Sequence, residues 1–282
     1  MTTANAPEFL LNRISEDMLE RLSMIKRDFQ TILLTSTMPA LEAKLGIAHK
    51  SSLILTMDTS SSRLQSCPGP VLVGDEEELP FAHERLDCIV SALSMQFLND
   101  LPGTLVQARR ALKPDGLMMA ALLGGQTLHE LRESFLQADS ELSSGIAPRV
   151  APFTDVRDAG GLLQRAGFAL PVADSDTLIV RYDTMLDLIS DLRALGWANA
   201  LTGRPKAMLR RDVVMRAGEL YAQNHTDSDG RIRATFQIIW LTGWAPHESQ
   251  QKPLKPGSAK SRLADALGTT EHIFNAPNDD EK

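Results

Sequence analysis

The chain has 282 residues, of which 43% are hydrophobic and 23% charged, and its formal net charge is −7 at pH 7. This composition is typical of a globular domain that buries a sizeable core. The negative charge argues against a dedicated nucleic-acid binder, because no basic stripe is present to neutralise phosphates. The two cysteines have no metal-binding spacing. No apolar run reaches the roughly 18 residues of a membrane span, and the first residues lack an apolar signal core. We therefore expect no membrane span and a cytoplasmic location.

The first third of the chain alternates between helical and strand patterns. Residues 8–28 carry apolar side chains at helical spacing, which predicts an amphipathic helix packed against a sheet. Short helices are also expected at 40–45 and after the polar run 59–62. Short apolar segments between polar residues predict strands at 31–37, 51–58 and 70–75.

A strand, a helix and a second strand follow in the next 40 or so residues. Residues 86–93 form a short, mostly apolar segment between polar residues, which suits a strand buried on both faces. Asn99 and Asp100 offer an N-cap for an amphipathic helix over 101–112. The sequence KPDG then ends the helix, because its proline cannot continue it and Gly116 permits a left-handed conformation. The apolar segment 117–123 completes a βαβ unit, which predicts parallel strands with a right-handed crossover.

The second half of the chain adds helices and two longer strands. Helices are expected at 127–142 and 155–166, strands at 168–182 and 231–246, and a helical insertion at about 184–224. The alternation of strands and helices predicts an α/β fold with a doubly wound sheet. We expect one domain over 1–268, followed by a disordered tail over 269–282.

Polar side chains stand at the ends of successive predicted strands. Asp58 ends the second strand, where a carboxylate can accept both hydroxyls of a ribose. Asp75 and Glu76 end the third strand, where a carboxylate can accept from the amino group of an adenine, and Ser91 lies in the fourth. Ligands of open α/β sheets bind outside the carboxyl ends of the strands. These four residues are therefore candidate contacts of a nucleoside cofactor.

Longer segments resemble a known family. GDEEELPF and LDCIVSAL…ALKPDGLMMAALL are similar to the adenine-side motif and the fourth-to-fifth-strand signature of class I S-adenosylmethionine-dependent methyltransferases. SALSMQFLNDLPG, GGQTLHEL and WAPHESQQKP resemble, more narrowly, the branch of the mitochondrial complex I assembly factor that hydroxylates an arginine of a complex I subunit, with its alphaproteobacterial relatives. The resemblance runs from about Leu10 to about Gly268.

This resemblance implies a fold, a cofactor and a partner. The fold is a Rossmann-like class I methyltransferase fold, with a seven-stranded, mostly parallel sheet in the order 3-2-1-4-5-7-6. Helices cover both faces of the sheet, and the helical insertion comes before the last strand. The implied cofactor is S-adenosylmethionine, and the implied partner is a protein client among the complex I subunits.

The loop after the first strand departs from the family pattern Asp-x-Gly-x-Gly-x-Gly. Leu33 stands at the acidic position, and Thr35, Thr37 and Pro39 stand at the three glycine positions. Those glycines let the backbone approach the methionine and ribose parts of the cofactor, whereas β-branched side chains resist positive φ. Thr35, Ser36 and Thr37 still offer hydroxyl groups and are kept as candidate cofactor contacts. Whether S-adenosylmethionine binds is left open by this loop.

Candidates on the substrate side follow the fourth and fifth strands: Ser94, Gly124, Gly125 and Gln126. The two glycines either allow a close approach of substrate or only turn the chain out of the strand. No residue is identified as catalytic. No metal site is predicted, because the six histidines do not give the two-histidine, one-carboxylate pattern of a non-haem iron enzyme.

Three functions remain open from the sequence. The chain is an arginine-modifying complex I assembly factor, an S-adenosylmethionine-dependent methyltransferase of unknown substrate, or a degenerate binding module without a cofactor. The acidic runs 75–78 and 174–176 could face an arginine-bearing client. Most acidic runs, however, are solvated surface.

Overall fold

The computed structural model describes residues 6–36, 38–48, 52–143, 145–206 and 208–251, together with 265, 268 and 269. The chain divides into two compact units, 1–247 and 248–282, and the sheet and the helices packed on it belong to the first. The expected tail over 269–282 lies outside the described residues except for its first residue, as does much of the region near the expected domain end at 268. Both therefore stay predictions.

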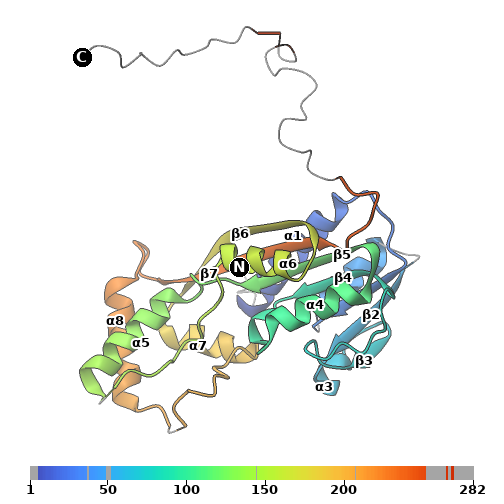
Figure 1. Cartoon of the computed structure of the whole chain (residues 1–282). Helices are drawn as coiled ribbons and strands as arrows, with labels where there is room; N and C mark the ends of the chain where they lie inside the picture. The colour runs from blue at the N-terminus through green and yellow to red at the C-terminus, as the bar shows by residue number, and fades with distance from the viewer. Residues whose placement is uncertain are drawn as a thin grey trace, which may run out of the picture. The chain divides into compact units, whose positions relative to one another are not determined.

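The first unit is built on a seven-stranded sheet with the order β3-β2-β1-β4-β5-β7-β6, so the predicted order is confirmed (Figure 1). Strands β1 to β5 pair in parallel, and β7 runs antiparallel to both β5 and β6. The strands are β1 Thr31–Thr35, β2 Leu53–Asp58, β3 Val71–Val73, β4 Leu86–Ala92, β5 Leu112–Leu123, β6 Ala169–Tyr182 and β7 Ile232–Trp244.

Helices cover both faces of this sheet. Figure 1 shows α4 (Leu101–Ala111) and α6 (Val156–Arg165) in front of it, and their apolar side chains form one core with that face. The other face carries a larger core. The helices that contribute to it are α1 Ala6–Ser23, α2 Pro39–Ala48, α5 His129–Leu142, α7 Met185–Ala194 and α8 Arg211–Asn224. Two short helices, α3 Ser61–Leu64 and the 3-10 helix Met95–Phe97, complete the unit.

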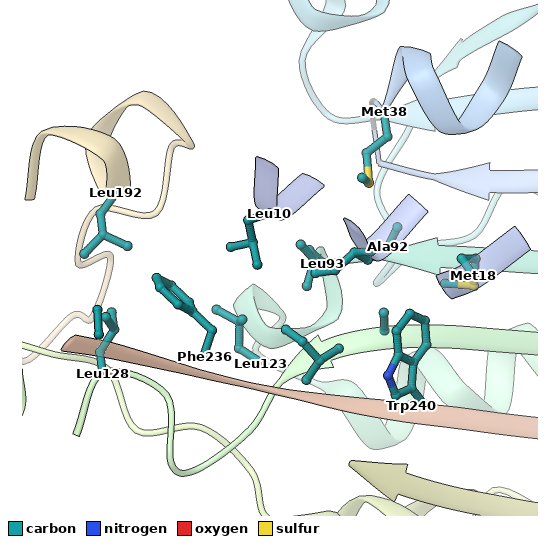
Figure 2. Close-up of a cluster of buried hydrophobic side chains, with 14 of the residues drawn as sticks. Leu10, Met18, Met38, Ala92, Leu93, Leu123, Leu128, Leu192, Phe236 and Trp240 are labelled. Atoms are coloured by element: carbon teal, nitrogen blue, oxygen red, sulfur yellow. The ribbon is translucent and has the colours of Figure 1, made fainter. Parts of the chain in front are cut away.

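Helix α1 lies over the antiparallel end of the sheet. Figure 2 shows Leu10 and Met18 of this helix in the same cluster as Phe236 and Trp240 of β7, so the predicted helix does pack on the sheet, although it ends at Ser23 and not at residue 28. The guanidinium carbon of Arg21 lies 4.4 Å from the centre of the Trp240 ring. Arg21 also donates two hydrogen bonds, of 2.8 and 2.7 Å, to the carboxylate of Asp174 on β6. Asp174 is thus paired within the chain, so the idea that it faces a client receives no support.

Local signals explain where several helices begin. Asp100 accepts a hydrogen bond of 2.9 Å from the backbone of Gly103, as the predicted N-cap of α4. Thr184 and Asp187 form a capping box at the start of α7. The segment expected to be helical at 184–224 contains α7 and α8, with a stretch between them that is not helical in its described residues.

The KPDG turn differs from the expectation at Gly116. Strand β5 already begins at Leu112, and the residue with a left-handed backbone is Asp115, at φ 62°. Asp tolerates this conformation better than most residues, and its backbone N–H donates to the carbonyl of Ala245 at 3.1 Å. Gly116 is required for a different reason: a Cβ there would lie 2.8 Å from the carbonyl oxygen of Lys113. The turn is thus a bulge at the start of β5, where the register with β4 shifts.

Candidate functional site

A cavity of about 670 Å³ lies at the carboxyl ends of β1 to β4. Its walls come from the residues that follow these four strands and from Arg193–Trp197 at the end of α7, so the helical insertion takes part in the site. Met38, Ala92 and Leu93 form an apolar part of the lining and belong to the larger core (Figure 2). The position is the one at which open α/β sheets bind ligands.

Five of the residues predicted from the sequence line this cavity: Ser36, Asp58, Asp75, Glu76 and Ser94. Thr35 and Ser91 are buried and do not line it. The hydroxyl of Ser91 lies 2.9 Å from that of Ser94, which does. Thr37 lies outside the described residues. Of the four residues named from the strand ends, Asp58, Asp75 and Glu76 thus line the cavity, and Ser91 does not.

The loop after β5 does not contribute to the cavity, since Gly124, Gly125 and Gln126 are not among its lining residues. This loop is attached to β7 instead. The backbone N–H of Gly124 donates to the carbonyl of Gln237 at 2.8 Å, and that of Gln126 donates to the side-chain oxygen of Gln237 at 3.1 Å. A Cβ on Gly124 would lie 2.6 Å from the same oxygen. The cavity thus gives no support to a substrate role for these residues, which stays a prediction.

Ser36 has the unusual backbone of the loop after β1. Its φ is 98°, a value that favours glycine. Its side chain donates a hydrogen bond of 2.8 Å to the carbonyl of Ala92, and its backbone N–H donates to Met57 at 3.0 Å. These contacts offset a backbone cost of roughly 1–2 kcal/mol. The sequence assigned the glycine positions to Thr35, Thr37 and Pro39. The structure places the first residue that needs a glycine-like backbone at Ser36, one position later than counted.

Glu76 is the most perturbed ionisable group in the cavity. The residue is 9% exposed, and one carboxylate oxygen, Oε2, has no hydrogen-bond partner among the described residues. Burial raises the pKa of Glu76 to about 7, and the charges of Asp58 and Asp75 add to the rise. The hydroxyls of Ser94 and Thr35 lie close enough to oppose it. A buried carboxyl group with a raised pKa in a cavity is a physical marker of a functional site.

The turn that carries Glu76 is fixed by its neighbours. The backbone N–H of Glu77 donates to the side chain of Asp75 at 2.9 Å. The carboxylate of Glu77 accepts from the backbone N–H of Asp100 at 2.7 Å, directly before α4, and this hydrogen bond lowers the pKa of Glu77. Gln107 of α4 donates to the carbonyl of Glu77 at 2.6 Å. With Glu77 held at the surface in this way, the side chain of Glu76 points into the cavity.

The ionisable lining of the cavity is predominantly acidic. It contains four carboxylates, from Asp58, Asp75, Glu76 and Glu77, and two guanidinium groups, from Arg63 and Arg193. Asp58 accepts from the backbone N–H of Ser60 at 2.9 Å, and its carboxylate lies 3.6 Å from Arg63. No group of three or more His, Cys, Asp or Glu side chains in the described part of the chain is arranged to hold a metal ion.

Comparison with known proteins places this fold in a family. The family profile described as "Methyltransferase domain" matches residues 43–120, which begin just after the altered loop. The zebrafish (Danio rerio) protein named "Arginine-hydroxylase NDUFAF5, mitochondrial" is 43% identical over 218 residues, covering 76% of this chain and 67% of the relative. The human protein of the same name is 43% identical over 192 residues, and the match covers 68% of this chain and 55% of the relative. The chain thus spans about half the length of the human protein.

A third relative and two solved structures extend the comparison. A malonyl-[acyl-carrier protein] O-methyltransferase of Gallionella capsiferriformans is 30% identical over 257 residues, 86% of each chain. The YcgJ protein of Bacillus subtilis superposes with a TM-score of 0.58 at 12% identity, covering 82% of this chain and 99% of that one. Phosphoethanolamine N-methyltransferase 2 of Haemonchus contortus, in complex with S-adenosylmethionine, gives 0.51 at 13% identity and covers 83% and 52%. At these identities, the structures show the fold alone.

The expected cytoplasmic location is wrong by this comparison. The zebrafish, human, rat and mouse relatives are all named as mitochondrial proteins. The first residues and the cysteine usage, from which the cytoplasm was expected, do not report on such a destination. Among the described residues, no helix combines the length and the apolar character that a membrane crossing needs.

The cavity fits S-adenosylmethionine only in part. Asp58 and Asp75 lie at the ends of β2 and β3, where carboxylates suit the ribose hydroxyls and the adenine amino group. The methionine end is expected beside the loop after β1. Ser36 places a side chain on the wall of the cavity there, and the carboxylate of Glu76 lies near Thr35, where it would repel the carboxylate of the cofactor. The residues therefore suit the nucleoside half and not the methionine half.

Three findings agree with one another: the sheet order, the matched family profile, and 43% identity to a relative of which the chain covers two thirds. The chain belongs to the class I S-adenosylmethionine-dependent methyltransferase superfamily, in the branch of the complex I assembly factors whose members are named arginine hydroxylases.

Proposed function

We propose that the chain assists the assembly of complex I by modifying an arginine of one of its protein subunits. The observation that carries this proposal is the 43% identity, over 218 residues, to a protein named as an arginine hydroxylase. The acidic cavity at the carboxyl ends of β1 to β4 supports it, because acidic side chains suit a cationic substrate. The location that goes with this proposal is the mitochondrion, which the names of the relatives give.

The modification is tested on the client itself. Complex I is purified from cells with the chain, without it and with the chain restored, and the arginine-containing peptides of its subunits are analysed by mass spectrometry. We expect one arginine to carry the mass of an added oxygen atom in the first and third samples and not in the second. Identical arginine masses in all three samples would contradict the proposal.

Methyl transfer from S-adenosylmethionine is the second candidate function. It is favoured by Asp58 and Asp75, which both line the cavity at positions suited to a nucleoside. Calorimetric titration with S-adenosylmethionine and S-adenosylhomocysteine tests it. Dissociation constants in the micromolar range would support methyl transfer, and the absence of binding at millimolar ligand would refute it. A chain that neither binds these ligands nor changes the mass of an arginine would be the binding module without a cofactor.

A further inference from the structure

Glu76 presents an unusual combination of burial and missing partners. The residue is 9% exposed, and Oε2, which has almost no solvent-accessible surface, makes no hydrogen bond to any described residue, although the hydroxyls of Ser94 and Thr35 lie near the carboxylate. A buried carboxylate without a full set of donors is unfavourable, so such groups are normally paired. The turn that holds Glu76 is tied to Asp75 and to the start of α4, so the side chain is kept facing the cavity. The side chain thus borders the cavity as an acceptor whose hydrogen-bonding capacity is not filled within the described part of the chain.

The rest of the cavity suits one type of cation. Three further carboxylates give the lining an excess of negative charge, although Arg63 and Arg193 also lie there. Met38 and Leu93 supply apolar surface, and Phe97 and Trp197 supply aromatic rings. We propose that this cavity receives the guanidinium group of a client arginine, with the carboxylate of Glu76 as its principal acceptor. The inference rests on the proposed function and adds the place and the residue by which the arginine is recognised.

A guanidinium group fits this lining better than an ammonium group does. It is planar, presents several N–H donors in a fixed arrangement and is more weakly hydrated, so less is lost when it leaves water. It pairs with a carboxylate through short, charge-assisted hydrogen bonds and stacks on aromatic rings. The three methylene groups of arginine can pack against apolar side chains such as those of Met38 and Leu93. A lysine side chain offers neither the planar geometry nor the stacking.

The test compares small probes of matched shape on the full chain. Acetyl-arginine methylamide, its lysine analogue and its citrulline analogue are titrated calorimetrically at pH 8.5. Citrulline keeps the shape of arginine and lacks its charge. We expect the arginine probe to bind at least about tenfold more tightly than either analogue. In Glu76→Gln, the arginine probe should bind about as weakly as the citrulline probe. Glu219→Gln on α8, which removes a carboxylate charge outside the cavity, should leave all three affinities unchanged.

Two results would overturn this proposal. One is equal binding of the arginine and citrulline probes by the unaltered chain, a comparison that needs no variant. The other is a Glu76→Gln protein, shown to be folded by thermal melting, that keeps the full arginine preference. Failure of the proposed function has a separate readout, the arginine mass in complex I. If an arginine of complex I is modified although the probes show no preference for arginine, the proposed function stands. Glu76 is then rejected as the residue that recognises the arginine.

Discussion

Replacing Glu76 by glutamine is expected to stabilise the protein in a pH-dependent way. Burial raises the pKa of Glu76 from its ordinary value of 4.5 to about 7 in the folded protein. Between these two pH values the folded state binds more protons than the unfolded state, so the stability contributed by this group falls as the pH rises. Glutamine has nearly the same shape and carries no charge. The free energy of unfolding of Glu76→Gln therefore does not fall with rising pH through this group.

The size of the effect follows from the change in pKa. Each pKa unit corresponds to about 1.4 kcal/mol, so a rise from 4.5 to about 7 costs the folded state about 3 kcal/mol once Glu76 is ionised. Glu76 is only 9% exposed, so water screens this cost little. Near pH 4 the carboxyl group is neutral in both states, and the two proteins should be equally stable. The difference should open between pH 4.5 and 7 and then remain constant.

Urea unfolding followed by tryptophan fluorescence measures this difference, with the midpoint compared at constant slope. The unaltered protein, Glu76→Gln and Glu219→Gln are unfolded at pH 4.5, 6, 7 and 8.5. Carboxyl groups that do not interact with Glu76 contribute equally to the unaltered protein and to Glu76→Gln and cancel in their comparison. A Glu76→Gln protein that is no more stable than the unaltered one at pH 8.5 would refute the reasoning. An advantage of the same size at pH 4.5 would refute it as well, because the gain would then not come from ionisation.

Three further predictions concern other parts of the structure. Ser36→Gly should be more stable than Ser36→Ala by about 1–2 kcal/mol, because both lose the hydroxyl and only glycine adopts a φ of 98° freely; equal urea midpoints would contradict this. Arg149→Met should lose about 3–5 kcal/mol, because the fully buried Asp139, whose pKa Arg149 holds low through two hydrogen bonds of 2.9 Å, loses its cationic partner and keeps only hydrogen bonds such as that from Ser143. The contribution of this pair is present above the ordinary pKa of an aspartate and is lost as the pH falls further, so a loss unchanged at acid pH would count against it. Gly124→Ala should cost about 1–3 kcal/mol through contact with Gln237, and Gln237→Ala should remove most of that cost in a double-mutant cycle.

The fold could be predicted because its signals are local. Apolar periodicity located the strands and helices, and the N-cap of α4 was predicted at Asn99 or Asp100, of which Asp100 is the one. The family resemblance supplied the strand order. Asp58 and Asp75 could be placed at one site, because the ends of neighbouring parallel strands lie at the same edge of a sheet.

What the sequence could not predict depends on contacts between distant residues. Glu76, Glu77 and Glu78 are chemically identical, and the hydrogen bonds of Glu77 to Asp75, Asp100 and Gln107 set which of them faces inward. The need for a glycine-like backbone falls at Ser36, because that position depends on where β1 ends, and strand boundaries are uncertain by a residue or more from sequence. From the sequence, Gly124 was expected either to turn the chain or to allow a close approach of substrate. In the structure a side chain at this position would collide with Gln237, which comes from a strand more than a hundred residues later.

The hydrogen bonds that hold Glu77 also affect the pKa of Glu76 in the cavity. No residue of α4 lines the cavity, yet the backbone N–H just before this helix and Gln107 within it hold the turn that carries Glu76. Without the carboxylate of Glu77, as in Glu77→Ala, the turn loses its hydrogen bond to the start of α4 and keeps those to Asp75 and Gln107, so Glu76 should gain exposure and its pKa should fall toward 4.5. Two adjacent glutamates thus have complementary roles. Glu77 restrains the turn, and Glu76 keeps a higher pKa than it would have if it were exposed to water.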